Sequence, residues 1–159
     1  MTVPDPRPDP CPDTGPGSKA RLRLWLKLLK TTRTLESGLR ENLRTEFAST
    51  LPRFDVMSAL ARNAGGLKMS ELSGLLKVSN GNVTGIVERL VEDGHVLREP
   101  VPGDRRANRV RLTRKGKEEF TRQAARHETW VDRFLSALDA DEAGAMTATL
   151  DRILTEGRS

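Results

Sequence analysis

Residues 100–116, PVPGDRRANRVRLTRKG, bring six basic side chains together with one acid, Asp104. Pro100, Pro102 and Gly103 are typical of a tight turn. The alternation of charged and apolar residues that follows is typical of a half-buried strand. Arginines on a narrow hairpin suit nucleic acid, because a narrow, electronegative minor groove attracts this side chain. The segment therefore favours a DNA-binding hairpin over a solvated basic loop. Its basic residues are Arg105, Arg106, Arg109, Arg111, Arg114 and Lys115.

The position of each charge in this hairpin predicts its role. Arg105 and Arg106 lie at the tip, which is narrow enough to enter a minor groove. Arg109 and Arg111 lie on the returning strand, where we expect them to follow phosphates. Asp104 would repel phosphate, so we expect it to hold a nearby arginine in a bidentate pair and to orient it.

A second polar cluster, SNGNVTG, occupies residues 79–85 at the predicted start of a short helix. Asparagine can pair bidentately with adenine, and a threonine methyl group can touch thymine. Asparagine is also a common helix cap, so base contact and capping both stay open. Gly85 favours either a close backbone approach or a packing gap against another helix. The candidate DNA-contacting residues of this helix are Ser79, Asn80, Asn82, Thr84 and Arg89.

The elements that carry these two clusters follow from periodicity and capping residues. Residues 68–94 predict two short helices, the first capped by Ser70 and the second ended by Gly94. Ser79 is the expected cap of the second helix. Two short helices, a glycine stop and a basic hairpin form a winged helix-turn-helix, whose second helix presents its first residues to the major groove. The expected buried residues of the two helices are Leu72, Leu75, Leu76, Val83, Ile86, Val87, Leu90 and Val91.

Longer helices flank this lobe. Leucines at three- and four-residue steps predict an amphipathic helix over residues 18–48. A second helix is expected to begin at the Thr50 cap and to end at Gly65 and Gly66. Thr113 predicts the start of a helix over residues 113–137, and Asp139 predicts the start of a last helix. Aromatic residues make up only 4% of the chain, which favours a helical protein whose aliphatic faces pack against a second subunit.

The segment ELSGLLKVSNGNVTGIVERLVEDGHVLREPVPGDRRANRVRLTRKG resembles the core of the MarR family of transcriptional regulators. The resemblance covers about residues 18–157. It implies an obligate homodimer formed by the first helix and the last two, two DNA-binding lobes on a palindromic operator, and usually repression relieved by a small ligand. It also implies that Arg106 enters the minor groove and that Asp104 orients it. The shared pattern is Val83-Thr84, Val87, Leu90, Gly94, Asp104-Arg105-Arg106, Val110, Leu112-Thr113 and Gly116.

The expected fold is mostly α, a winged helix-turn-helix with long N- and C-terminal dimerisation helices and one β-hairpin wing. Four regions are expected along the chain. They are a disordered Pro-rich tail (1–17), a dimerisation and ligand-pocket helix (18–48), the DNA-binding lobe (50–113) and the C-terminal dimerisation helices (114–157).

In this family the ligand usually enters between the dimerisation helices and the DNA-binding lobe. The two tryptophans also suit core or dimer packing, and the histidine also suits an ordinary hydrogen bond. The segments LRLWLKLLKTTRTLE and LPRFDVMSALAR resemble a subgroup that controls aromatic-acid catabolism. This implies an aromatic carboxylate or an aryl-CoA thioester as the effector. Candidate ligand-binding residues are Trp25, Arg33, Arg40, Phe54, His127 and Trp130.

Composition limits the other function classes. A net charge of +5 favours an acidic partner, here double-stranded DNA. With two histidines, no tyrosine and no phosphate-binding loop, the chain is not expected to be an enzyme or to bind a cofactor or metal. The only cysteine, Cys11, lies in the predicted tail, so no redox sensor is expected. No signal peptide or membrane span is evident, which predicts a cytoplasmic protein. The alternative function is a non-specific architectural DNA-binding protein.

Overall fold

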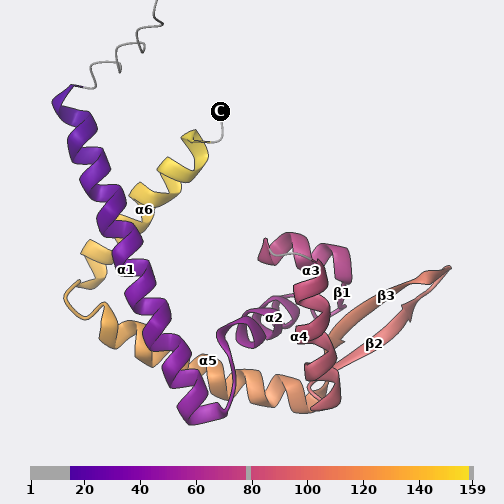
Figure 1. Cartoon of the computed structure of the whole chain (residues 1–159). Helices are drawn as coiled ribbons and strands as arrows, with labels where there is room; N and C mark the ends of the chain where they lie inside the picture. Colours follow the sequence, from indigo (N-terminus) through magenta and orange to yellow (C-terminus); the bar gives the residue numbers. More distant parts are fainter. Residues whose placement is uncertain (1–14, 78–79, 158–159) are drawn as a thin grey trace, which may run out of the picture. The chain divides into compact units, whose positions relative to one another are not determined.

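The computed structural model describes residues 15–77 and 80–157 (Figure 1). The chain divides into two compact units between Glu36 and Ser37. Helix α1 (Pro16–Phe47) contributes residues to both units. Because α1 begins at Pro16, the expected tail over residues 1–17 extends two residues too far. The rest of that tail, with Cys11, lies outside the described residues, except for Gly15.

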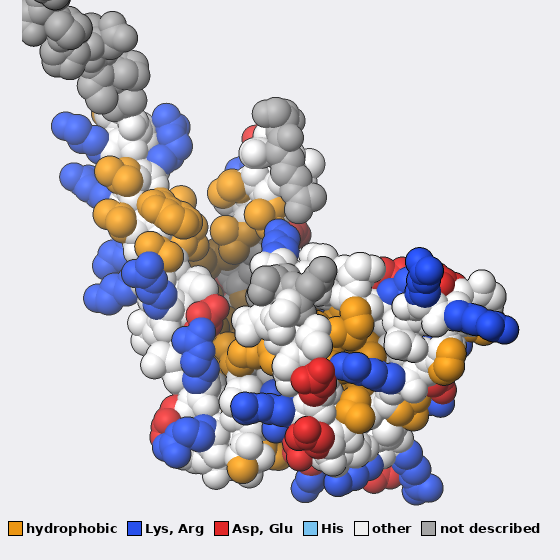
Figure 2. Space-filling view, turned by 45° about the vertical axis from the view of Figure 1, so that its right-hand side comes forward, with side chains coloured by type: hydrophobic (Ala, Val, Ile, Leu, Met, Phe, Trp, Pro, Cys, Tyr) orange, Lys and Arg blue, Asp and Glu red, His pale blue; other side chains and the backbone are white. Residues whose placement is uncertain are grey.

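The first unit is the basic and apolar beginning of helix α1. From Pro16 to Glu36 the chain contains six lysines or arginines and one acid. Four large apolar side chains are also exposed on this segment, and Figure 2 shows hydrophobic and basic side chains side by side on it. The segment therefore offers both charge and apolar surface to a partner. The exposed apolar residues are Leu22, Leu24, Trp25 and Leu26.

The second unit contains a winged helix-turn-helix followed by two further helices (Figure 1). Its three-stranded antiparallel sheet has the order β1-β3-β2. The mostly α fold with a β-hairpin wing is confirmed, and the short strand β1 is an addition to the prediction. The elements after α1 are α2 (Leu51–Arg62), β1 (Leu67–Lys68), α3 (Met69–Leu76), α4 (Asn80–Glu92), β2 (Val96–Val101), β3 (Asp104–Leu112), α5 (Arg114–Phe134) and α6 (Ala140–Glu156).

Side-chain caps define the starts of three helices as predicted. Thr50 accepts a hydrogen bond from the backbone N–H three residues later (3.3 Å), and Thr113 does the same at the start of α5 (3.0 Å). Asp139 and Glu142 form a reciprocal capping box at the start of α6. These caps occupy backbone N–H groups that have no partner within the helix.

The expected end of the second helix is wrong. Helix α2 ends at Arg62 rather than at the two glycines, because the Asn63 side chain caps it by donating to the carbonyl of Ala59 (2.8 Å). Gly66 instead allows β1 to approach β3. It has a φ of +84°, and a Cβ there would lie 2.8 Å from the carbonyl oxygen of Val110.

Helix α3 also begins differently from the prediction. Its N-cap is Lys68, not Ser70, and the Lys68 backbone N–H donates to the Glu71 carboxylate (2.7 Å). The expected burial of Leu75 is wrong as well, because this side chain is 58% exposed. The buried side of this two-turn helix runs through Leu72 and Ser73, so Leu75 lies outside the stripe.

One apolar cluster joins α2, α3, α4 and all three strands. Of the predicted α4 residues, Val83, Val87 and Leu90 are fully buried, whereas Ile86 is half-buried and Val91 is exposed. The cluster fixes α4 against the base of the wing. It consists of Val56, Met57, Ala59, Leu60, Leu67, Leu72, Val83, Val87, Leu90, Val96, Val110 and Leu112.

Helix α6 differs from this lobe because none of its residues is buried. Its apolar side chains, Met146, Leu150, Ile153 and Leu154, are all exposed. Among the helices of residues 15–77 and 80–157, none is long and apolar enough to cross a membrane.

Candidate nucleic-acid interface

Helix α4 buries one face and exposes the opposite one, as its sequence predicts. The buried residues Val83, Val87 and Leu90 recur at three- and four-residue steps. Asn82 and Arg89 are exposed on the other side, and Thr84 is half-buried. The helix begins at Asn80, but the Asn80 side chain and Ser79 lie outside the described part of the chain.

Gly85 lies on the exposed side of α4. A Cβ added at this position meets no described atom within 4 Å outside the helix's own backbone. Among the described residues, no neighbouring helix therefore requires glycine at this position. The interpretation of Gly85 as a packing gap against another helix is wrong. An absent side chain does leave the α4 backbone open to a close approach from outside.

The exposed side of α4 forms one wall of a cleft of about 440 Å³. The start of α2 forms the other wall and adds Arg53, whose guanidinium forms an ion pair with Asp93. Arg53 was not among the predicted site residues. Its position in the first turn after the predicted Thr50 cap was the available signal. The cleft is lined by Ala48, Thr50, Arg53, Gly81, Asn82, Gly85, Ile86 and Arg89.

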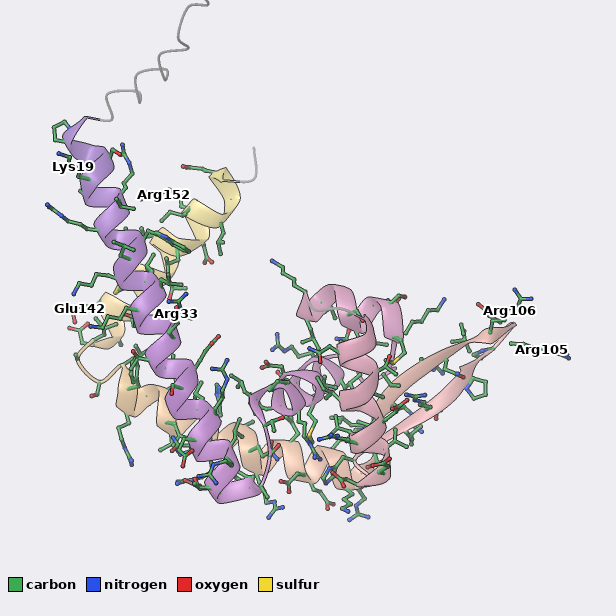
Figure 3. All side chains as sticks on the ribbon, in the orientation of Figure 1. Lys19, Arg33, Arg105, Arg106, Glu142 and Arg152 are labelled. Carbon is green, nitrogen blue, oxygen red and sulfur yellow. The ribbon has the colours of Figure 1, made fainter. Side chains whose placement is uncertain are left out.

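The tip of the wing is a turn between β2 and β3. Gly103 has a φ of +82°, and Arg105 and Arg106 extend from the exposed end of the hairpin (Figure 3). Asp104 accepts a hydrogen bond from the Arg106 backbone N–H (3.0 Å). In the described part of the chain Asp104 forms no ion pair. The expected bidentate contact with an arginine is therefore replaced by a backbone contact that organises the turn.

The base of the wing contains a carboxylate that the sequence analysis did not single out. Glu99 accepts a hydrogen bond from Arg111 Nε (2.8 Å), and Arg111 Nη2 lies 2.7 Å from Glu99 Oε1. Arg109 Nε lies 3.7 Å from Glu99 Oε2. The Arg111 guanidinium lowers the pKa of Glu99, and Glu99 raises the pKa of Arg111. Both strand arginines therefore face an internal acid as well as solvent. The sequence Arg98-Glu99-Pro100, an acid on the strand just before the predicted turn, could have indicated this pairing.

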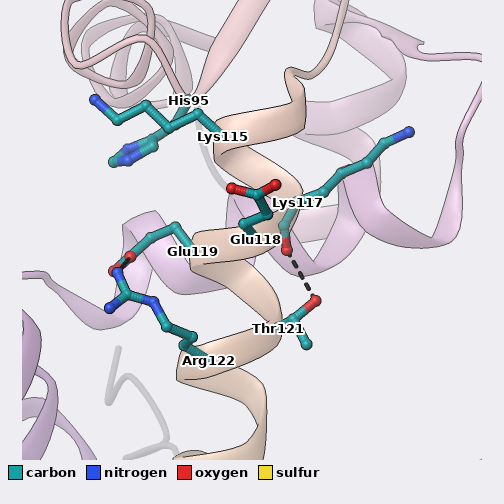
Figure 4. A pocket seen from close by; sticks show the side chains of 7 residues that line it. All are labelled: His95, Lys115, Lys117, Glu118, Glu119, Thr121 and Arg122. Atoms are coloured by element: carbon teal, nitrogen blue, oxygen red, sulfur yellow. Dashed lines mark hydrogen bonds and ion pairs between the residues drawn. The ribbon is translucent and has the colours of Figure 1, made fainter.

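The wing also joins the start of α5 closely. Thr113 donates its backbone N–H to the carbonyl oxygen of His95 (3.0 Å), and a Cβ at Gly116 would lie 1.9 Å from that oxygen. A neighbouring surface pocket of about 510 Å³ contains the His95 ring and Lys115 (Figure 4). Burial, with the nearby Lys115 ammonium, lowers the pKa of His95.

The six candidate ligand-binding residues are distributed over both units, four in the second and two in the first. Phe54 is buried and stacks on His127, with ring centroids 4.6 Å apart. Trp130 is also buried and contacts Phe47 edge to face (6.3 Å). Arg40 is exposed on the part of α1 that belongs to the second unit. The other two candidates, Trp25 and Arg33, are exposed in the first unit.

Metal-ligand side chains do not cluster in the described residues, where no group of three or more could hold an ion. The chemistry of the site is therefore that of hydrogen-bonding and basic side chains. A helix with an exposed polar face beside an arginine-tipped hairpin defines a winged helix-turn-helix DNA-binding protein.

Comparison with known proteins places this chain within that class. Residues 50–107 match the model of the MarR family. The structure of a MarR family transcriptional regulator from Silicibacter pomeroyi is 33% identical, with a TM-score of 0.75, and the match covers 89% of this chain and 98% of that one. The chain belongs to the MarR family of transcriptional regulators.

Two other relatives bear on function. A mutant of MarR from E. coli, solved in complex with operator DNA, is 26% identical with a TM-score of 0.73, and the match covers 85% of this chain and 96% of that one. The transcriptional activatory protein BadR of Rhodopseudomonas palustris is 32% identical over 97 residues. That match covers 60% of this chain and 55% of BadR, so the chain spans about half the length of this relative.

Proposed function

We propose that this protein is a homodimer that binds a palindromic operator and is released from it by a small aromatic ligand or an aryl-CoA thioester. The observation that carries the DNA-binding part is the exposed polar face of α4 beside the arginine tip of the wing. The direction of regulation is taken as repression, the usual mode of the family. BadR is a transcriptional activatory protein, so activation is the second candidate.

The proposed contacts divide into base contacts and backbone contacts. The side chains of Asn82 and Thr84, with Ser79 and Asn80, suit base edges at the start of α4. Arg106 suits the minor groove, because its turn holds it at the end of the hairpin. The remaining basic candidates, Arg89, Arg105, Arg109 and Arg111, suit phosphates, which supply affinity without sequence preference.

Two exposed helices support the proposed homodimer. From Asp139 to Glu156 the chain contains five acids and one arginine, which complements the basic stretch from Pro16 to Glu36. Both segments also expose large apolar side chains. A second copy would cover this apolar surface and bring opposite charges together. The proposed dimerisation regions are residues 18–48 and 114–157.

The aromatic stack supports an aromatic effector. Phe54 and His127 lie against each other with ring planes 15° apart, and the half-buried His127 ring lines a surface pocket that suits a planar ring. The basic residues of α1, including Arg33 and Arg40, suit a carboxylate or the phosphates of CoA. Trp25 and Trp130 complete the proposed set. We assign the protein no catalytic activity and place it in the cytoplasm.

A footprint on the DNA upstream of its own gene tests this proposal. We expect two protected half-sites whose centres lie about one helical turn apart. Asn82→Ala should weaken operator binding by about 1–3 kcal/mol per half-site and leave non-specific binding nearly unchanged. Adding aromatic acids or their CoA thioesters should remove the footprint. Equal affinity for operator and unrelated DNA would instead support an architectural protein.

A further inference from the structure

One face of the wing sheet combines basic side chains from β1 and β3 with the carboxylate of Glu99 on β2. In the strand register, Arg109 is opposite Glu99 on one side and opposite Lys68 on the other. Arg111 follows two residues later on β3, so its side chain lies on the same face. This face is opposite the one formed by Val96, Val110 and Leu112, which are buried in the core.

The carboxylate does not satisfy all of these cations. Arg111 contacts Glu99 Oε1 through both Nε (2.8 Å) and Nη2 (2.7 Å). Arg109 Nε is 3.7 Å from the other oxygen, which is too long for a hydrogen bond, and it has no hydrogen-bond partner in the described part of the chain. Arg109 Nε is itself buried, so only the exposed part of this guanidinium can meet a phosphate. Beside the one Glu99 carboxylate, the face therefore keeps a positive charge.

The pairing is also easily exchanged. The side chains of Glu99, Arg109 and Arg111 are between 31% and 39% exposed. Ion pairs with this much solvent access are weak, so another anion can replace the carboxylate at small cost. A DNA phosphate would bring its own negative charge and would release condensed counterions on binding.

We propose that Glu99 is an internal counter-ion that competes with DNA phosphates for Arg109 and Arg111, and so limits the affinity of the wing for DNA. Lys68 completes this phosphate-binding face. The inference rests on the proposed function, which assigns the two arginines to phosphates. Because phosphates are common to all DNA, Glu99 weakens operator and unrelated DNA alike and leaves their affinity ratio unchanged.

The variant Glu99→Gln tests this role, because it keeps the side-chain shape and removes the charge. We expect the full-length protein to bind operator and unrelated duplex about threefold to fivefold more tightly at about 0.1 M salt. The plot of log affinity against log salt should steepen by about 0.9 per subunit. Thermal unfolding confirms that the variant is folded, and Glu99→Thr, which suits a strand, makes the same test if the glutamine variant unfolds.

Glu118→Gln is the matched control. Glu118 forms an exposed pair with Arg114 on α5 (3.0 Å), so its loss changes the net charge equally without touching the wing face. We expect no change in its salt slope. Unchanged or weaker binding by folded Glu99→Gln, or equal tightening by the control, would overturn the competing role.

Arg111→Ala separates this inference from the proposed function. If Arg111→Ala weakens binding to both DNAs but Glu99→Gln does not tighten it, only the role of Glu99 is wrong. If Arg111→Ala leaves affinity and salt slope unchanged, the phosphate contact itself is wrong, and the inference is wrong with it.

Discussion

The DNA-binding lobe and helix α6 have similar amphipathic sequences but opposite degrees of burial. In the lobe, Leu72 and Leu90 are fully buried among α2, α3, α4 and the sheet. In α6, Ile153 is 48% exposed and Leu154 is 62% exposed. An apolar stripe therefore predicts a helix and a face that needs cover. It does not say whether that cover comes from the same chain.

A charge in the exposed apolar stripe of α6 tests whether a second copy covers this stripe. We expect Ile153→Asp to weaken dimerisation by about a hundredfold or more, because each copy would place an unpaired charge in an apolar interface. Operator affinity should fall with it, while the lobe stays folded. Sedimentation at micromolar concentration measures the assembly, and circular dichroism reports the fold.

Leu72→Ala is the matched change in the lobe. It should lower the free energy of unfolding by about 2–5 kcal/mol, because it removes buried methyl groups and leaves a cavity. The dimerisation constant of the folded protein should stay the same. If the wild-type protein sediments as a monomer, α6 forms no dimer interface and the proposed homodimer is wrong.

The tip of the wing is also exposed, and the partner proposed for it is DNA rather than a second copy. Asp104→Ala removes an acid from the proposed DNA-binding surface, yet it also removes the acceptor for the Arg106 backbone N–H. We expect specific binding to weaken, because the turn no longer holds Arg106. Titration of an operator with A·T-rich flanks at physiological salt measures this effect.

Arg106→Ala provides the companion variant. It should weaken operator binding by about 1–3 kcal/mol. The loss should be larger with A·T-rich than with G·C-rich flanks, since A·T-rich sequence narrows the minor groove. Tighter specific binding by Asp104→Ala would contradict the positioning role and leave a simple basic loop.

Gly85 has a smaller effect, with opposite signs for stability and binding. Gly85→Ala should raise the free energy of unfolding by about 0.5–1 kcal/mol, because the space around it is open and alanine favours a helix. Operator binding should weaken, because a methyl group would obstruct the approach of DNA. Chemical denaturation and operator titration measure the two effects.

Gly74→Ala in α3 is the control, since a Cβ there also meets no described atom within 4 Å outside the helix's own backbone. It should stabilise the protein similarly without weakening operator binding. If Gly85→Ala binds the operator as tightly as wild type, no close backbone approach occurs at α4.

The smallest expected effect is that of pH, and it falls on the lobe and α5, because α6 contains no histidine. Burial lowers the pKa of both His95 and His127. Near and below pH 6.5, the unfolded chain therefore binds more protons than the folded one. The free energy of unfolding is therefore highest above pH 6.5, and it decreases as the pH falls toward the lowered pKa values of the two histidines in the folded state.

Urea unfolding between pH 5.5 and 7.5 checks this dependence. His95→Gln should reduce the slope of unfolding free energy against pH and leave dimerisation unaffected over that range. The same slope with and without His95 would show that its burial does not affect proton binding.

Local rules determined much of this protein from its sequence. The caps at Thr50, Thr113 and Asp139, the stop at Gly94 and the hairpin turn at Gly103 were all predictable. Each depends on a hydrogen bond or backbone conformation within a few residues, so a short stretch of sequence is sufficient. The exposed face of α4 also followed from its 3.6-residue period.

Features that depend on contacts between distant segments of the chain became evident only in the folded structure. Leu75 is exposed because α3 meets the core along a narrow stripe, and Gly66 is needed because β1 lies against Val110. The pairing of Glu99 with Arg109 and Arg111 depends on the register of β2 and β3. A shift of one residue would place Glu99 on the opposite face of the sheet, so composition alone cannot assign its partners.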